Sequence, residues 1–328
     1  MAPPPSRLVL PLLLFALFVS APMGGAAQTS PRVVASILPV HALAAEVMAG
    51  VGKPDLLVPG NTSPHSFTLR PSDARKLREA DIVFWVGEGL ENFLQSPLEK
   101  LATGARILAL SQAEGVSLRP ASRDIATSIA APPFSGSGTV HQHGTGAETG
   151  ERGASDGGDW HIWLDPENAR AMAAAMAGAL IQSDPVNAAS YRQNLTRLTT
   201  RLGELTREIE ATLAPVREIP FAVFHDAYRH FGQRFGLRPV AIVTHAPGRP
   251  LGARRLGEVR AALTAGRAVC LFREPPFPPS LAETILKGTT VRLGLLDPEG
   301  GTLEPGEGAY FALIRGMAEA LRHCLRSG

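Results

Sequence analysis

The sequence predicts an α/β protein of two lobes, each a mostly parallel sheet flanked by helices, joined by one long rigid helix. Short apolar runs typical of strands alternate with helical patterns in the first part of the chain and again in the last part. A long helical stretch with a single apolar stripe lies between them. The length of 328 residues also suits two domains of ~100–200 residues each.

The composition indicates a globular protein. Hydrophobic residues make up 45% and charged residues 19%, which is unlike the highly charged profile of disordered chains. Lys and Arg number 32 against 30 Asp and Glu, for a formal net charge of +2, and no block of five like charges occurs. This balance argues against a nucleic-acid-binding protein, which usually presents a basic face or arm.

Residues 1–27 are expected to form a cleaved signal peptide. They carry one charge, Arg7, followed by an apolar run at residues 8–19 and small residues at 25–27. A retained membrane anchor is the alternative, but the run is shorter than the ~20 residues that a spanning helix needs. No cysteine lies near the cleavage site, so a lipid anchor is not expected. The chain is therefore predicted to be exported.

Residues 28–165 are predicted to form the N-terminal lobe. Pro71 stands where proline is favoured, at the first position of a helix. The expected strands are 32–37, 56–58, 82–86 and 107–110, and the expected helices are 41–49, 71–80 and 90–101. A stretch at 121–159 then breaks the alternation. Gly, Ser, Ala and Thr dominate it, with His141 and His143 inside, which indicates a mobile loop.

Residues 166–214 form the predicted helical region. Asp165 has the position of an N-cap, with Pro166 and Glu167 in the first turn, and that helix should extend to about residue 182. The sequence at 183–185 then starts the long helix. Its apolar residues recur at steps of three and four: Leu195, Leu198, Leu202, Leu205, Ile209 and Leu213. A coiled-coil dimer is the alternative, but we expect this helix to link the two lobes.

Residues 215–328 are predicted to form the C-terminal lobe, because the alternation resumes there. The expected strands are 221–225, 240–243, 268–272 and 290–295, and the expected helices are 227–235, 254–265, 280–286 and 308–325.

This lobe contains both cysteines of the chain, Cys270 and Cys324. Two cysteines in an exported protein suggest one disulfide, which the chain-entropy model values at about 4 kcal/mol. The alternative is a pair of buried free thiols.

Four residues at the ends of predicted strands or beside loops are candidate metal ligands. His225 closes a strand, Asp297 follows one, His65 lies in the loop after another, and His161 stands between the long loop and a helix start. Ligands of open α/β sheets bind beyond the carboxyl ends of strands. The sequence has neither H-E-x-x-H nor C-x-x-C, so any metal site must be assembled from distant segments. Each histidine taken alone is more often an ordinary surface or capping residue.

A family resemblance covers nearly all of residues 31–325. The chain resembles the zinc-uptake ABC transporter solute-binding proteins of Gram-negative periplasms in the segments LLVPGNTSPHSFTLRPSDARKLREADIVFWVGEGLENFL, DWHIWLDPENA, FAVFHDAYRHFGQRFGL, VCLFREPPF and LGLLDPEG. The resemblance implies two α/β lobes joined by a long rigid helix, with metal bound in the cleft between them. It also implies a non-enzymatic, monomeric periplasmic protein that captures Zn²⁺ with high affinity and delivers it to an ABC permease.

The same resemblance implies which residues hold the metal. The family's ligands fall on His65, His161 and His225, and its cysteine pair falls on Cys270 and Cys324. Relatives place a metal-ligating Asp where this chain has Asp297, as a possible fourth ligand directly or through water. Two departures stand out. Pro64 occupies the position of a Glu that some members use as a ligand, and the loop offers only His141 and His143 for a weak second site.

The kind of metal and the class of function have alternatives. Three imidazoles suit Zn²⁺, whereas manganese-binding relatives tend to carry a Glu at the position of His225. The same scaffold carrying manganese or iron is therefore the second hypothesis. A secreted zinc hydrolase, with Glu274 or Asp297 as base, is the third, but no hydrolase motif supports it. A surface adhesin is the fourth, and the absence of a lipid-anchor cysteine weighs against it.

Overall fold

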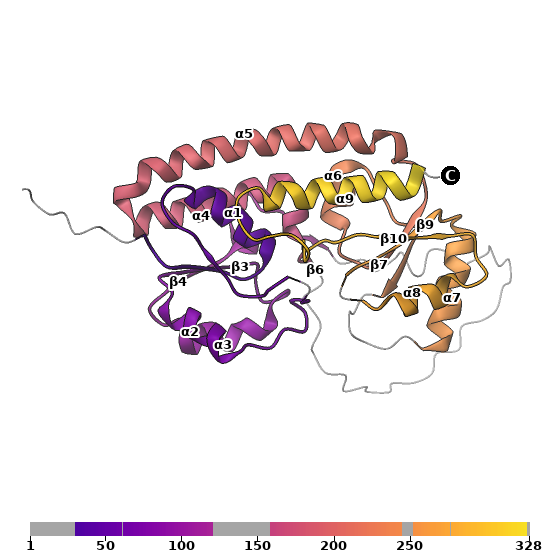
Figure 1. Ribbon diagram of the computed structural model, residues 1–328, viewed down its shortest axis with the longest axis horizontal. Helices are drawn as coiled ribbons and strands as arrows, with labels where there is room; N and C mark the ends of the chain where they lie inside the picture. The colour runs from indigo at the N-terminus through magenta and orange to yellow at the C-terminus, as the bar shows by residue number, and fades with distance from the viewer. Residues whose placement is uncertain (1–29, 61, 121–157, 245–251, 276, 327–328) are drawn as a thin grey trace, which may run out of the picture.

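The computed structural model describes residues 30–60, 62–120, 158–244, 252–275 and 277–326 (Figure 1). Within these ranges, two four-stranded parallel sheets lie in the two halves of the chain. The proposed signal peptide and residues 121–157 of the loop fall outside them. No helix of the described residues is both long and apolar enough to cross a bilayer.

The N-terminal lobe is built on the first sheet, whose strand order is β2-β1-β3-β4. Its strands are β1 (Val33–Ala35), β2 (Asp55–Leu56), β3 (Ile82–Trp85) and β4 (Arg106–Ala109). Its helices are α1 (Leu38–Met48), α2 (Pro71–Glu79) and α3 (Gln95–Leu101), the last preceded by the 3₁₀ turn η1 (Asn92–Leu94). A second 3₁₀ turn, η2 (Leu110–Gln112), follows β4.

The C-terminal lobe is built on the second sheet, whose strand order is β10-β9-β7-β8. Its strands are β7 (Phe221–His225), β8 (Ala241–Thr244), β9 (Cys270–Arg273) and β10 (Arg292–Leu295). Its helices are α6 (Arg229–Phe235), α7 (Ala253–Ala265), α8 (Pro279–Leu286) and α9 (Ala309–Arg326). The predicted α/β class with a parallel sheet in each lobe is confirmed.

Each sheet packs one face on its own small core and the other on a core that both lobes share. Successive strand residues point to opposite faces. Val34 therefore packs with side chains of α2 and α3, while Val33 and Ala35 belong to the shared core. In the second sheet, Phe224 packs over α7 and α8, while Val223 reaches the shared core. The shared core places the two lobes on one common layer of helices.

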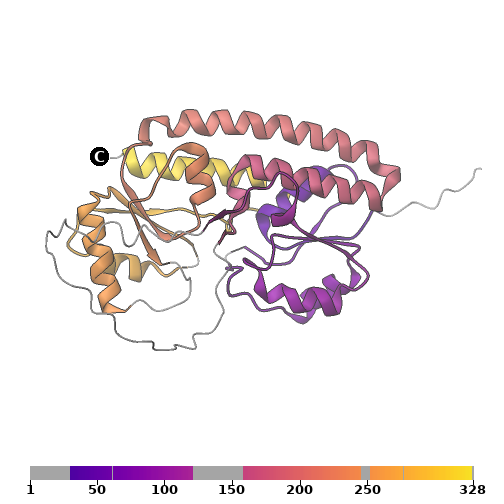
Figure 2. The ribbon, with the colours of Figure 1, turned by 180° about the vertical axis from the view of Figure 1, so that it is seen from behind.

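That common layer is organised by α5 (Ala188–Leu213), which follows α4 (Pro166–Ser183) and the turn η4 (Pro185–Asn187). Helix α5 packs against α4, α1 and α9 and extends over both lobes (Figures 1 and 2). Its stripe from Leu198 to Leu213 is buried, and Leu195 is partly buried against it. The predicted linking helix is confirmed, and the turn η5 (Ala214–Val216) leads from it toward β7.

A short antiparallel pair closes the base of the long loop. Strand β5 (Arg119–Pro120) pairs with β6 (Gly158–Asp159), with Arg119 opposite Asp159. The sequence assigns residues 158 and 159 to the loop, and the structure places them in this pair instead. The turn η3 (Ile162–Leu164) follows directly. The predicted cap of α4 is present, because the Asp165 side chain accepts a hydrogen bond from the Glu167 amide.

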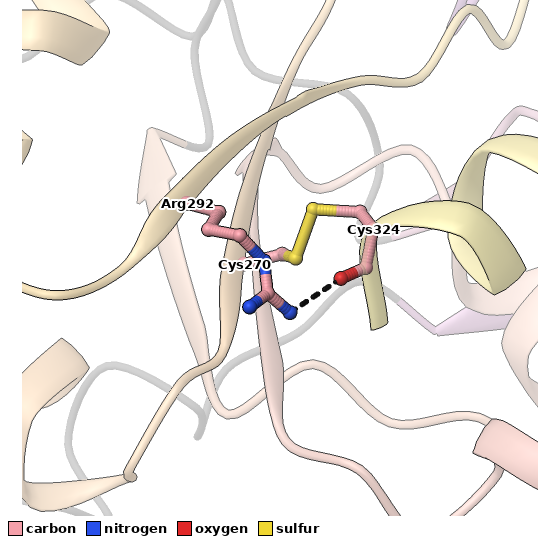
Figure 3. The surroundings of a disulfide bond; sticks show 3 residues. All are labelled: Cys270, Arg292 and Cys324. Carbon is pink, nitrogen blue, oxygen red and sulfur yellow. Dashed lines mark hydrogen bonds between the residues drawn. A yellow bond between two sulfur atoms is a disulfide. The ribbon is translucent and has the colours of Figure 1, made fainter. Parts of the chain in front are cut away.

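The predicted disulfide between Cys270 and Cys324 is confirmed (Figure 3). It ties the first residue of β9 to the last turn of α9. Arg292, at the start of β10, donates a hydrogen bond of 2.6 Å to the carbonyl oxygen of Cys324. The C-terminal helix is thereby fastened to the second sheet while it also packs against α5 and α1.

Candidate metal centre

Three histidines from separate segments meet between the two lobes. His65 lies in the segment between β2 and α2, His161 precedes the turn η3, and His225 is the last residue of β7. Their ring centroids lie 5.5 Å (His65 and His161), 5.3 Å (His65 and His225) and 5.1 Å (His161 and His225) apart. One ring nitrogen from each lies within 4.8 Å of those of the other two, so the cluster has the dimensions of a metal site.

His161 is fixed by a buried carboxylate. Asp159 Oδ1 lies 2.8 Å from His161 Nδ1 and also accepts the backbone N–H of His161 at 3.0 Å. Both side chains are almost completely buried. His161 also packs against the fully buried Trp163, whose Nε1 donates to the carbonyl oxygen of Pro298. The other ring nitrogen, Nε2, is buried and has no hydrogen-bond partner among the described residues. It is therefore free for a ligand.

His225 has a similar partner in Glu274, which directly follows β9, the neighbour of β7 in the sheet. His225 Nδ1 lies 3.5 Å from Glu274 Oε1, and both side chains are buried. The Tyr228 hydroxyl donates to the same carboxylate oxygen at 3.0 Å. Burial lowers the pKa of His225, but the negative charges of Glu274, Asp159 and Asp226 together outweigh it, so the net pKa is raised above its ordinary value.

His65 has a different environment. It is exposed, and its backbone N–H donates to Ser63 Oγ at 3.3 Å. No carboxylate of the described residues pairs with its ring. Although solvent reaches this residue, the protein atoms packed around its imidazole reduce the hydration of the ring and lower its pKa well below the ordinary value, and His161 and His225 lower it further. His65 therefore favours the neutral form, which is the form that binds a metal.

Asp297 stands outside the three-histidine cluster. Its Oδ1 accepts the backbone N–H groups of Glu299 at 3.1 Å and Gly300 at 2.8 Å, which caps the turn after β10. Burial raises the pKa of Asp297, against those hydrogen bonds, and Glu274 raises it further. Burial also raises the pKa of Glu299 well above its ordinary range, with Glu274, Asp297 and Glu91 adding to it. A fourth ligand at Asp297 stays a prediction.

The remaining sequence-predicted ligands, His141 and His143, lie outside the described residues. Sequence reasoning missed the partnership of Asp159 with His161 and of Glu274 with His225. Glu274 carried a partial signal, because it is an acid just after a predicted strand run, but the sequence does not show that this strand lies beside the one that His225 closes. Asp159 had a weaker one, as an acid two residues before a candidate ligand.

The arrangement suits a divalent ion of borderline softness. Three imidazoles leave one tetrahedral position open, which water or a carboxylate can fill. Neutral nitrogen donors favour zinc, copper or nickel, whereas manganese and magnesium favour oxygen. The acidic surroundings, with Asp159 and Glu274 behind two of the rings, favour a cation at the centre of the cluster.

Comparisons with known proteins agree with this picture. A family model described as zinc-uptake complex component A, periplasmic, matches residues 33–324. The high-affinity zinc uptake system protein ZnuA of Brucella abortus (strain 2308) is 38% identical over 315 residues, covering 89% of this chain and 91% of that protein. The protein of the same name from Yersinia pestis is 35% identical over 318 residues, covering 96% of each.

Among solved structures, the periplasmic zinc-binding protein TroA from Treponema pallidum aligns with a TM-score of 0.72 at 17% identity. The alignment covers 90% of this chain and 99% of that one. At this identity the likeness concerns the fold alone, and it supports the two-lobed α/β arrangement.

Proposed function

This chain belongs to the family of periplasmic component A proteins of zinc-uptake complexes, and we propose that it holds Zn²⁺ through His65, His161 and His225. As a member of the family it is a high-affinity zinc-binding protein of an ABC-type uptake system. The family is one of solute-binding components, so its zinc is cargo to be carried.

The observation that carries the ligand assignment is the meeting of three imidazoles from three distant segments. Two of them, His161 and His225, turn Nδ1 toward a buried carboxylate and leave Nε2 for the ion. The buried, unpartnered Nε2 of His161 is costly to leave without a ligand. A zinc ion at ~2.0–2.1 Å from each ring would satisfy it.

The proposal also covers export of the chain, delivery of its zinc and the fourth ligand. We propose that residues 1–27 direct export and are cleaved, and that the mature monomer passes its zinc to a membrane permease. Asp297 is proposed as the fourth ligand, directly or through a bound water, because the turn that it caps is joined to His161 through Trp163 and Pro298.

A competition titration of the mature protein tests this function. We expect one tight zinc equivalent that excess Mn²⁺ displaces poorly, since three imidazoles favour Zn²⁺. A variant with all three cluster histidines replaced by Ala should lose the tight site. The matched control is His323→Ala, which removes an exposed histidine of α9 and should bind zinc as the unaltered protein does. Retention of the tight site by the triple variant would disprove the assignment.

A further inference from the structure

Two buried carboxylates stand directly behind two of the three imidazoles. Asp159 is 5% exposed and Glu274 is 4% exposed. Each faces the Nδ1 side of one histidine, at 2.8 Å for Asp159 with His161 and 3.5 Å for Glu274 with His225. Burying an acidic side chain is expensive unless it is paired, so each of these acids needs a reason to be there.

Neither acid is paired with an Arg or Lys side chain among the described residues. Asp159 Oδ1 accepts the backbone N–H of His161 and lies 2.8 Å from its Nδ1, while Oδ2 is buried with no partner in the described part of the chain. Glu274 accepts a hydrogen bond from the Tyr228 hydroxyl. Their negative charge is thus directed toward the histidine cluster, and no basic side chain of the described residues forms an ion pair with either acid.

Zinc held by three neutral imidazoles brings a charge of +2 into this buried place. A carboxylate beside each of two rings supplies −2, so these two acids match the charge of the ion before any fourth ligand is counted. The 2.8 Å contact of Asp159 favours a proton on Nδ1 of His161, and the charge of Glu274 at 3.5 Å favours the same tautomer of His225. A proton on Nδ1 leaves the Nε2 lone pair for the metal, and a carboxylate beside it raises the ring's donor strength.

We propose that Asp159 and Glu274 are positioning residues of the zinc site, which orient His161 and His225 for binding through Nε2 and offset the charge of the ion. This inference rests on the proposed function. It gives Asp159 and Glu274, which lie behind the ligands, a contribution to zinc affinity that is separate from that of any fourth ligand.

Amide variants isolate the charge, because Asp159→Asn and Glu274→Gln keep the shape and an acceptor oxygen. Each should bind one zinc equivalent with about 10–100-fold lower affinity in a chelator competition. The matched control is Asp184→Asn, a buried acid that accepts from Tyr191 and Asn187 and contacts none of the three histidines. Its zinc affinity should be unchanged. Wild-type affinity in both site variants would overturn the proposal.

An NMR measurement of the zinc-loaded, unaltered protein keeps the proposal testable if a variant fails to fold. Long-range ¹H–¹⁵N spectra should show a protonated Nδ1 and a zinc-bound Nε2 on both His161 and His225, with each Nδ1 proton shifted downfield by its carboxylate. Zinc on Nδ1 of either ring would overturn the proposal. If the unaltered protein holds no tight zinc, the proposed function itself fails; if it does and the amide variants match it, only the role of the two acids fails.

Discussion

The metal centre has two unlike sides. His161 and His225 are buried and each has a buried carboxylate behind it, whereas His65 is exposed and has none among the described residues. The first side belongs to regular elements, the end of β7 and the start of η3, and the second to an irregular segment between β2 and α2. One side is therefore organised before zinc arrives, and the other completes the site from the solvent side.

This difference suits a carrier. Preorganised ligands bind tightly because little freedom is lost on binding. A ligand on an exposed loop provides a route by which the ion can enter and leave.

Removing any one imidazole should produce the largest effect. His65→Ala, His161→Ala and His225→Ala are each expected to lower zinc affinity at least about 100-fold, which corresponds to about 2.7 kcal/mol. A chelator competition at fixed pH measures this. For His65→Ala the loss should appear chiefly as faster zinc dissociation, which stopped-flow with a colorimetric chelator detects. Unchanged affinity in any one variant removes that residue from the site.

Changing the chemistry of one anchored ligand should alter metal preference. His225→Glu replaces an imidazole with a hard oxygen donor, and we expect the ratio of Zn²⁺ to Mn²⁺ affinities to fall by about tenfold or more. Paired titrations with each metal measure the ratio. An unaltered ratio would show that His225 does not determine selectivity.

The two sides should also differ in the zinc-free protein. His161→Ala and His225→Ala leave Asp159 or Glu274 buried without its imidazole, so each should lower the free energy of unfolding by about 1–3 kcal/mol. His65→Ala leaves no such group and should stay within about 0.5 kcal/mol of the unaltered protein. Urea unfolding of the apo proteins measures both. Equal losses in all three variants would contradict the division of the site.

The two sides of the site should also differ in the pKa values of their histidines. The pKa of His225 is raised above 6.5 and that of His65 lies well below 6.5. Because the pKa of His225 is higher in the folded protein than in the unfolded chain, protonation of this residue stabilises the zinc-free fold. This stabilisation is complete below pH 6.5 and is lost as the pH rises through the pKa of His225 in the folded protein. The pKa of His65 is lowered, so this residue stabilises the zinc-free fold above pH 6.5, where it is neutral, and that stabilisation is lost as the pH falls toward the pKa of His65 in the folded protein.

Protons should therefore compete with zinc at His225 at higher pH than at His65. Zinc affinity is expected to begin falling above pH 6.5 on acidification, and Glu274→Gln should move this onset to lower pH because it removes the charge that raises the pKa. NMR titration of the ring C–H signals follows each histidine separately. A higher pKa for His65 than for His225 would reverse the assignment.

Most of the fold could be predicted from the sequence, because the periodic patterns are long and well bounded. Strand β7 has the predicted bounds, and Pro71 and Asp165 begin their helices as expected. The β5–β6 pair could not be predicted. Two-residue strands have no periodicity, and Gly158 and Asp159 are residues that strands usually disfavour.

The site was predictable in its ligands but not in its supporting acids. Histidines at strand ends can be placed together once the sheet is inferred to be parallel, because carboxyl ends meet at one edge. The contact of Asp159 with His161 depends on the turn between them, which no sequence pattern specifies. The contact of Glu274 with His225 depends on strand order, since β9 and β7 are neighbours in space but not in sequence.

The central claim is that one zinc ion is bound by His65, His161 and His225. A crystal structure of the mature protein loaded with one zinc equivalent, with anomalous data at the zinc edge, tests it most directly. We expect one strong anomalous peak at ~2.0–2.1 Å from a ring nitrogen of each of the three histidines, through Nε2 at His161 and His225. A principal peak elsewhere, or one that lacks any of the three imidazoles, would contradict it.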